Sequence, residues 1–238
     1  RHFFSLLILL LSIASVRAEE FMFKHIEVKD GLPNNSITAI IKDSKGFMWI
    51  GTASGLTRYD GHNFHVFRNQ KNDTLSIPDN YVDFIIEDKD ENLWMRAGGE
   101  FVLYDLQMER FVRHPNSYYK KAGVPDKPHY VYVDSEGDYW FYQNWNGCYY
   151  YHRKSGEAQN LMVAEDALPG SALRGMTEYG DEMILLFDNG EMYGIDKYSM
   201  NITWKDSYLV DGVAGRGAEE FALFKDAEDW VWIYSARG

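Results

Sequence analysis

The sequence predicts an all-β fold, a β-propeller of four-stranded blades with about five repeats present. Aromatic residues make up 16% of the 238 residues, and flat rings pack well on pleated sheets. A short acidic turn followed by an aromatic strand recurs with a period in the mid-forties, which is typical of one blade per repeat. The single cysteine, Cys148, excludes an internal disulfide, so the hydrophobic core must stabilise the sheets.

The first 18 residues have the features of a secretory signal peptide. A basic start at Arg1 precedes an apolar run over residues 3–15, and Val16 and Ala18 occupy the −3 and −1 positions before a cleavage site. The apolar run is shorter than the roughly 20 residues that a membrane-spanning helix needs. Export without disulfides fits a bacterial periplasm, so we expect the mature chain in that compartment.

The repeat places an acidic residue six positions before an anchor residue. Four copies have a tryptophan as the anchor, and they run from Asp43 to Trp49, Asp88 to Trp94, Asp134 to Trp140 and Asp226 to Trp232. A weaker copy from Glu178 to Ile184 keeps the spacing but lacks both the aspartate and the tryptophan. Successive anchors are separated by 45, 46, 44 and 48 residues. We expect the four tryptophans to pack between neighbouring blades rather than to contact a ligand.

The first repeat divides into four short apolar strands separated by turns. The strands are expected at 36–42, 47–52, 56–60 and 64–68. Asp43 and Gly46 belong to the first turn, because aspartate caps backbone N–H groups and glycine accepts a positive φ.

The same reading divides the whole chain into segments. We expect a signal peptide at 1–18, an outer strand and linker at 19–35, and repeats at 36–80, 81–127, 128–172, 173–219 and 220–238. Within the linker, residues 20–28 look like an outer strand without a blade of its own. The last repeat stops after its second strand, so the chain is expected to be part of a larger, incomplete propeller.

The first repeat closely resembles the two-component regulator propeller repeat. The residues that carry the resemblance are 31–37, 40–52 and 55–60, including Gly31-Leu32-Pro33 and Gly46-Phe47-Met48-Trp49. The second and third repeats keep the acid, the tryptophan and a tyrosine, which are Tyr104 and Tyr151. The later repeats match the family's repeat at fewer positions.

This resemblance implies a part in signalling. Proteins of the family are periplasmic sensor regions in which two seven-bladed propellers and a β-sandwich precede a membrane span, a histidine kinase and a response regulator. The chain would then be the N-terminal part of an inner-membrane-anchored hybrid two-component protein, which we expect to be a homodimer at full length. The implied ligand is an oligosaccharide that controls polysaccharide-utilisation genes. The kinase lies outside this sequence, and the chain itself is expected not to be an enzyme and to need no cofactor.

One turn of the third repeat is more polar and aromatic than the equivalent turns of its neighbours. Where the first repeat has small residues at 51–55, the third has residues 142–147, one residue longer. Turns between second and third strands share one face of a propeller, so the following side chains are expected to converge as a sugar site: Arg96, Gln143, Asn144, Trp145, Asn146 and Arg237. An aromatic ring packs on the C–H face of a sugar, while amides and arginine bind its hydroxyls. Alternatively, Trp145 packs against a neighbouring loop or another domain.

Two other functions fit the same pattern. An exported glycoside hydrolase is one alternative, since the acid-to-tryptophan turn looks like the Asp-box of sialidases, although that motif has one residue fewer. A propeller that docks another protein is the second, and it would also explain Trp145. Sugar turnover would separate the first alternative from a sensor, and loss of sugar binding on Trp145→Ala would separate the second.

Charge and motifs exclude several classes of function. A net charge of −12 and a pI of about 5.0 disfavour nucleic-acid binding. His62 and His65 lack a third metal ligand, and the acids at 88–92 and 134–138 lack the spacing of a calcium loop, so no metal site is expected. Nucleophile-elbow, phosphate-loop and zinc-protease motifs are absent from the sequence.

Overall fold

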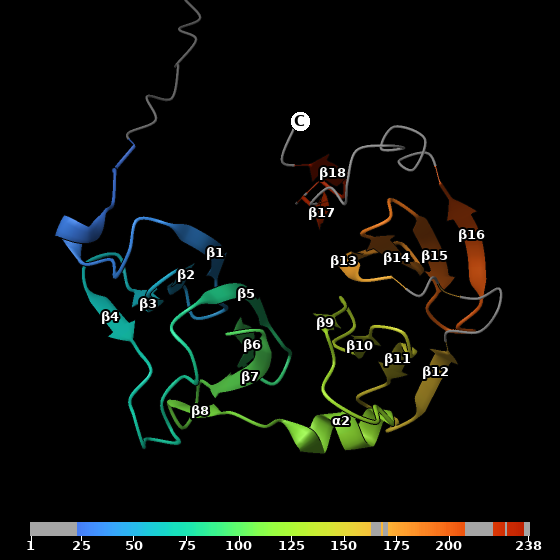
Figure 1. Cartoon of the computed structure of the whole chain (residues 1–238), viewed down its shortest axis with the longest axis horizontal. Helices are drawn as coiled ribbons and strands as arrows, with labels where there is room; N and C mark the ends of the chain where they lie inside the picture. The colour runs from blue at the N-terminus through green and yellow to red at the C-terminus, as the bar shows by residue number, and fades with distance from the viewer. Residues whose placement is uncertain (1–22, 163–167, 169–170, 208–220, 227, 236–238) are drawn as a thin grey trace, which may run out of the picture.

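The computed structural model describes residues 23–162, 168, 171–207, 221–226 and 228–235. Within these residues the chain forms four four-stranded antiparallel sheets and one two-stranded sheet, in chain order (Figure 1). The predicted β-propeller is therefore confirmed. The observed strands of the first repeat each lie within one residue of the predicted bounds.

Each sheet is one blade, and its strands are paired in sequence order. The first blade contains β1 (Ile37–Lys42), β2 (Met48–Thr52), β3 (Gly55–Tyr59) and β4 (Phe64–Phe67). The second contains β5 (Val82–Glu87), β6 (Asn92–Ala97), β7 (Glu100–Asp105) and β8 (Arg110–Val112). The third contains β9 (Tyr130–Val133), β10 (Tyr139–Gln143), β11 (Gly147–Tyr151) and β12 (Ala158–Met162). The fourth contains β13 (Leu173–Tyr179), β14 (Glu182–Phe187), β15 (Met192–Asp196) and β16 (Ile202–Asp206), and a half-blade contains β17 (Phe221–Lys225) and β18 (Val231–Ser235).

The blades follow one another around a common centre (Figure 1). The first strand of each blade lies innermost, where β1 contacts β5, β5 contacts β9, and β13 contacts β9 and β17. Because the strands alternate in direction, turns between first and second strands lie on one face, and turns between second and third strands lie on the opposite face. We call these the acid-turn face and the Trp145 face.

The acid of each repeat organises the acid-turn face. The Asp43 carboxylate accepts hydrogen bonds from the backbone N–H groups of Lys45 and Phe47, at 3.0 and 2.8 Å. Its other oxygen accepts the indole N–H of Trp49 at 2.7 Å. The spacing of six therefore reflects one side chain that satisfies the turn and the anchor together. The same indole-to-carboxylate bond recurs at 3.1, 3.0 and 2.7 Å for Trp94–Asp88, Trp140–Asp134 and Trp232–Asp226.

The anchors form the core between blades. Trp49, Trp94 and Trp140 are fully buried. Trp49 packs on Tyr104 of the next blade, with ring centroids 5.1 Å apart. Trp232 lies on the half-blade and is 52% exposed, since no further described strand covers it. The packing role expected for these side chains is thus observed at three of the four positions.

The structure corrects the alignment of the fourth repeat. Ile184 pairs with Thr177, just as Trp49 pairs with Ile41, so Glu178 corresponds to Lys42 rather than to Asp43. The true counterpart of the aspartate is Tyr179, and the turn that follows contains only Gly180 and Asp181. This turn is shorter than the one in the first repeat, so the spacing of six between Glu178 and Ile184 is a coincidence.

Two further features differ from the expected organisation. Residues 23–27 form no strand, and a 3-10 turn, η1 (Val28–Asp30), follows them. The local backbone donors are used by side chains instead, since Glu27 N donates to the Asp30 carboxylate and Val28 N to the Asn35 side chain. Residues 20–22 lie outside the described part of the chain.

The second difference is a helix, α2 (Asn116–Ala122), between the second and third blades (Figure 1). It buries Tyr119 and Ala122, and Tyr118 packs edge-on against Trp94 at 5.1 Å. The helix ends at Gly123, whose φ of +73° suits glycine. Tertiary packing on the second and third blades therefore stabilises a segment that has only seven residues.

Candidate functional site

The turn that carries Trp145 connects β10 to β11 on the Trp145 face. The backbone N–H of Asn146 donates to the carbonyl of Gln143 at 3.1 Å and closes the turn. Trp145 is 68% exposed and has a φ of +64°. The equivalent turn of the second blade has glycines at 98 and 99, with φ of +62° and +84°. A bulky side chain thus occupies a conformation that normally favours glycine, and such positions concentrate at functional sites.

Three of the predicted site residues lie together in this turn with Trp145. The Gln143 side chain is buried and accepts a hydrogen bond from the Asn146 amide at 2.7 Å. The Asn144 backbone N–H donates to His129 Nδ1 at 3.2 Å, and its side-chain oxygen accepts the Leu173 N–H at 3.5 Å. Gln143 and Asn144 therefore hold the turn in place, while the Trp145 ring is left open to solvent.

The remaining two predicted site residues do not join the turn. Arg96 lies within β6 and forms a two-pronged ion pair with Asp83, at 2.7 and 3.0 Å. Asp83 is the bulged residue between Val82 and Phe84 of β5, which turns its side chain toward Arg96. This pairing satisfies the guanidinium within its own blade. Arg237 lies outside the described residues.

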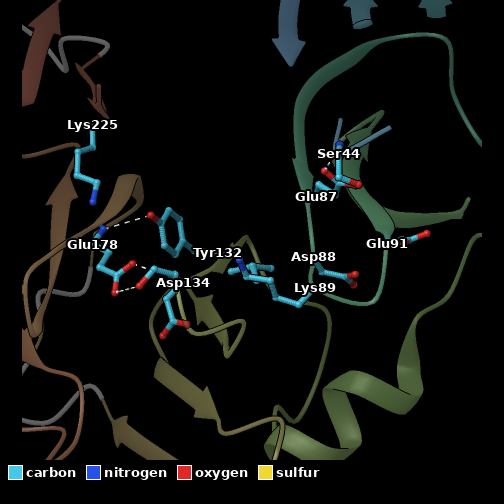
Figure 2. Close-up of a pocket in the computed structure, with 11 residues that line it drawn as sticks. Ser44, Glu87, Asp88, Lys89, Glu91, Tyr132, Asp134, Glu178 and Lys225 are labelled. Carbon is cyan, nitrogen blue, oxygen red and sulfur yellow. Dashed lines mark hydrogen bonds between the residues drawn. The ribbon is translucent and has the colours of Figure 1, made fainter. Parts of the chain in front are cut away.

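A cavity of about 540 Å³ lies on the opposite, acid-turn face, and we call it the channel pocket. It opens where the innermost strands of all five sheets end (Figure 2). The lining residues are Ser44, Glu87, Asp88, Lys89, Glu91, Tyr132, Val133, Asp134, Ser135, Glu178 and Lys225. Small-ligand sites occupy roughly 300–1,000 Å³, so the volume fits such a site.

Two glutamates of the pocket connect neighbouring blades in the same way. Glu87 accepts hydrogen bonds from the N–H and hydroxyl of Ser44, at 2.8 and 2.6 Å. Glu178 accepts the same pair from Ser135, both at 2.8 Å. In each case the serine directly follows the aspartate of the preceding blade's turn, Asp43 or Asp134. Glu87 and Glu178 therefore occupy equivalent positions of their repeats.

A buried charge cluster lies behind Glu178. The side chain of Lys197 is 3% exposed, and its ammonium hydrogen bonds to Glu178 and lies 4.0 Å from the Asp134 carboxylate. Burial raises the pKa of Asp134. Burial also acts to raise the pKa of Glu178, but the hydrogen bonds from Lys197 and Ser135 outweigh it and lower that pKa. The pKa of Lys197 is raised, because its carboxylate partners outweigh burial.

The channel pocket was missed from the sequence because its residues come from five repeats. One local signal existed: Ser44 and Glu87 are 43 residues apart, and so are Ser135 and Glu178. That equal separation marks a contact between successive blades. Lys197 carries no such signal, because its partners Glu178 and Asp134 are identified only by their positions in the fold.

Neither metal sites nor membrane spans are found in the part of the chain that the structure describes. No group of three or more His, Cys, Asp or Glu side chains there could hold a metal ion. No helix among the same residues is long and apolar enough to cross a membrane.

Comparison with known proteins shows which class of protein this chain resembles. Residues 31–54 match the family model described as two component regulator propeller. The chain is therefore a β-propeller that carries the two-component regulator repeat, and the resemblance stated from its sequence is confirmed. It is also 37% identical over 76 residues to Histidine kinase P4 of Formosa agariphila, an alignment covering 31% of this chain and 6% of that protein.

Two solved structures share the fold. One is the extracellular domain of a putative hybrid two component system from B. thetaiotaomicron, with a TM-score of 0.66 and 17% identity. It covers 90% of this chain and 29% of the other. The second is the extracellular domain of a putative one component system from the same organism, with a TM-score of 0.64, 20% identity, and coverage of 88% and 30%. The chain thus spans less than a third of each of these structures.

Proposed function

We propose that this chain is a non-catalytic periplasmic sensor module of a hybrid two-component signalling protein. The regulator repeat at 31–54, the histidine kinase relative and the propeller fold support this role. A signal peptide at 1–18 would deliver the module to the periplasm. Further propeller and β-sandwich domains, an inner-membrane anchor and a dimeric kinase belong to the proposed full-length protein.

The proposed ligand is an oligosaccharide that controls polysaccharide-utilisation genes, bound at the Trp145 turn. The observation that carries this proposal is the conformation of Trp145, which combines 68% exposure with a φ of +64°. A strained backbone that presents an aromatic ring to solvent fits a ligand platform better than a packing role. The Asn144 NH2 group and the Asn146 side-chain oxygen, which make neither of these bonds, would bind the sugar hydroxyls, while the bonded amide atoms and Gln143 fix the turn.

The test is calorimetric titration of the chain against plant, host and microbial oligosaccharides. We expect one class of sugar to bind without hydrolysis, and Trp145→Ala to abolish the heat of binding. Trp230→Ala is the matched control, because Trp230 is 65% exposed and lies on the half-blade. Turnover of any sugar would replace this proposal with a glycoside hydrolase. A folded protein that binds none of the sugars would favour the docking function.

A further inference from the structure

A cavity of about 460 Å³ lies beside helix α2, and we call it the α2 pocket. The helix itself lies at the outer rim of the propeller (Figure 1). Asn116, Tyr119 and Lys120, which share one face of the helix, line the pocket together with residues 124–127. None of these residues lines the channel pocket or belongs to the Trp145 turn. The α2 pocket is therefore separate from both, and its volume is in the range of small-ligand sites.

The hydroxyl of Tyr119 has no hydrogen-bond partner among the described residues. The residue is only 6% exposed, and its ring packs edge-on against Phe141 at 5.7 Å. The hydroxyl is not one of the fully enclosed side-chain atoms that lack a partner in the described part of the chain, so it opens into the pocket that Tyr119 lines. Burial raises the pKa of Tyr119, so the hydroxyl keeps its proton at neutral pH. Because a buried tyrosine hydroxyl normally finds a partner, this one calls for a ligand that accepts its hydrogen bond.

Two ammonium groups line the same pocket. The Lys120 side chain forms no ion pair or hydrogen bond with any residue that the structure describes. Lys127 pairs with Glu100 at 2.5 Å, which leaves two of its three N–H groups for a ligand. The pocket therefore offers the Tyr119 hydroxyl and both ammonium groups as hydrogen-bond donors.

Two carboxylates limit the charge that a ligand can carry. Asp126 lines the pocket and accepts the backbone N–H of Lys127 at 2.8 Å, while Glu100 pairs with the Lys127 ammonium. With Lys120 these four charges cancel, so selection rests on direct contacts rather than on net charge. One carboxylate can accept from Lys120 and from the Tyr119 hydroxyl, and such charge-assisted bonds are stronger than those of a neutral carbonyl. A second negative charge would meet Asp126 and Glu100 without a further cation.

We propose that the α2 pocket binds a small monocarboxylate. The carboxylate accepts hydrogen bonds from the Tyr119 hydroxyl and the Lys120 ammonium. The apolar part of the ligand packs on Val124 and Pro125, which line the same cavity. This site depends neither on the Trp145 turn nor on the proposed sensor role.

The test is saturation-transfer NMR and calorimetric titration of the whole chain with acetate, butyrate, hexanoate and benzoate at neutral pH. We expect at least one to bind saturably, and its primary amide to bind at least about tenfold more weakly. Lys120→Met should weaken binding about tenfold or more, and Tyr119→Phe about threefold to tenfold. Lys121→Met is the matched control, because Lys121 is the next residue of the helix, is exposed, and does not line the pocket.

Asp126→Asn gives a second readout of opposite sign. The loss of a nearby negative charge should tighten carboxylate binding by up to about fivefold, while the asparagine oxygen can still accept the Lys127 N–H. Trp145→Ala should leave carboxylate binding unchanged, so this site and the Trp145 site fail separately. The proposal is overturned if no carboxylate binds saturably or if the amide binds equally well. Equal weakening by Lys121→Met and Lys120→Met, or tighter binding of inorganic phosphate, would also overturn it.

Discussion

Glu178 binds Ser135 of the preceding blade through both of its carboxylate oxygens, at 2.8 Å to the backbone N–H and 2.8 Å to the hydroxyl. Glu87 makes the same pair of bonds to Ser44 between the first two blades. The two contacts differ in their surroundings. Glu178 is buried and also neutralises Lys197, whereas Glu87 is partly exposed and has no such partner among the described residues.

We therefore expect unequal effects from one chemical change. Glu178→Gln should lower the free energy of unfolding by about 3 kcal/mol or more, because it leaves the buried Lys197 ammonium poorly compensated. Glu87→Gln should cost only about 0.5–1.5 kcal/mol, the value of ordinary hydrogen bonds. Urea unfolding measures both, with Glu91→Gln as an exposed control. Equal losses would show that the Lys197 pair contributes nothing to stability.

The pH dependence of the same substitution has a defined sign. The pKa of Glu178 lies below its ordinary value of 4.5 in the folded state, so its stabilising contribution is present above pH 4.5 and is lost as the pH falls through the lowered pKa. The stability difference between the unchanged chain and Glu178→Gln should accordingly shrink in acid. A series of urea titrations at decreasing pH checks this. A difference that grows in acid would assign the effect to another group.

The anchors allow a comparison of one side chain in two environments. Trp140→Phe should lower the free energy of unfolding by about 2–4 kcal/mol, because the buried Asp134 oxygen loses its donor and the smaller ring leaves a void. Trp232→Phe should cost less than about 1 kcal/mol, since its ring is half exposed. Thermal or urea unfolding of the two variants gives the answer. Similar losses would mean that Trp232 is covered in solution.

Replacing Trp145 by glycine should make the fold more stable while removing the proposed ligand platform. A non-glycine residue in the left-handed region costs about 1–2 kcal/mol, and glycine removes most of that cost at a φ of +64°. We expect urea unfolding to show a rise in the free energy of unfolding of up to about 1 kcal/mol. The gain is no larger because glycine also increases the conformational freedom of the unfolded chain. A clear loss of stability would indicate that the Trp145 ring packs against the protein.

Cys148 should be unreactive in the folded protein. It is fully buried on β11, and burial raises the pKa of its thiol to about 12, so the thiolate is scarce at neutral pH. Reaction with a thiol reagent such as dithionitrobenzoate should follow global unfolding and accelerate in urea in step with it. Rapid reaction without denaturant would show that the edge of the third blade opens locally.

The sequence was most informative where structure is local and repeated. The Asp43 turn could be predicted because a single side chain fixes both the turn and Trp49, and the same solution recurs. The fourth repeat was misaligned at Glu178 because spacing does not reveal strand register. Helix α2 was missed because packing on Trp94 of the second blade and Phe141 of the third, rather than its own propensity, stabilises it.

The candidate site was predictable only in part. The position and exposure of Trp145 follow from a turn that departs from its repeat, and residues 143–146 are neighbours in sequence. The ion pair of Arg96 with Asp83 was not predicted, because Asp83 lies on a bulge that no sequence pattern indicated. The channel pocket depends on five strand ends meeting in space, which a list of repeats does not provide.

The boundaries between blades are chemically unlike one another. Arg153 of the third blade pairs with Asp90 of the second at 2.5 Å. Asp90 stands two residues after the acid of its turn, and the same place in the first blade is Lys45, which pairs with Glu91 of the second blade. If the third blade packed against the first, in the same chain or in another, two cations would meet. The repeat makes every blade similar, yet these side chains favour the observed neighbours over the first and third blades side by side, which works against a chain of near-copies exchanging its parts.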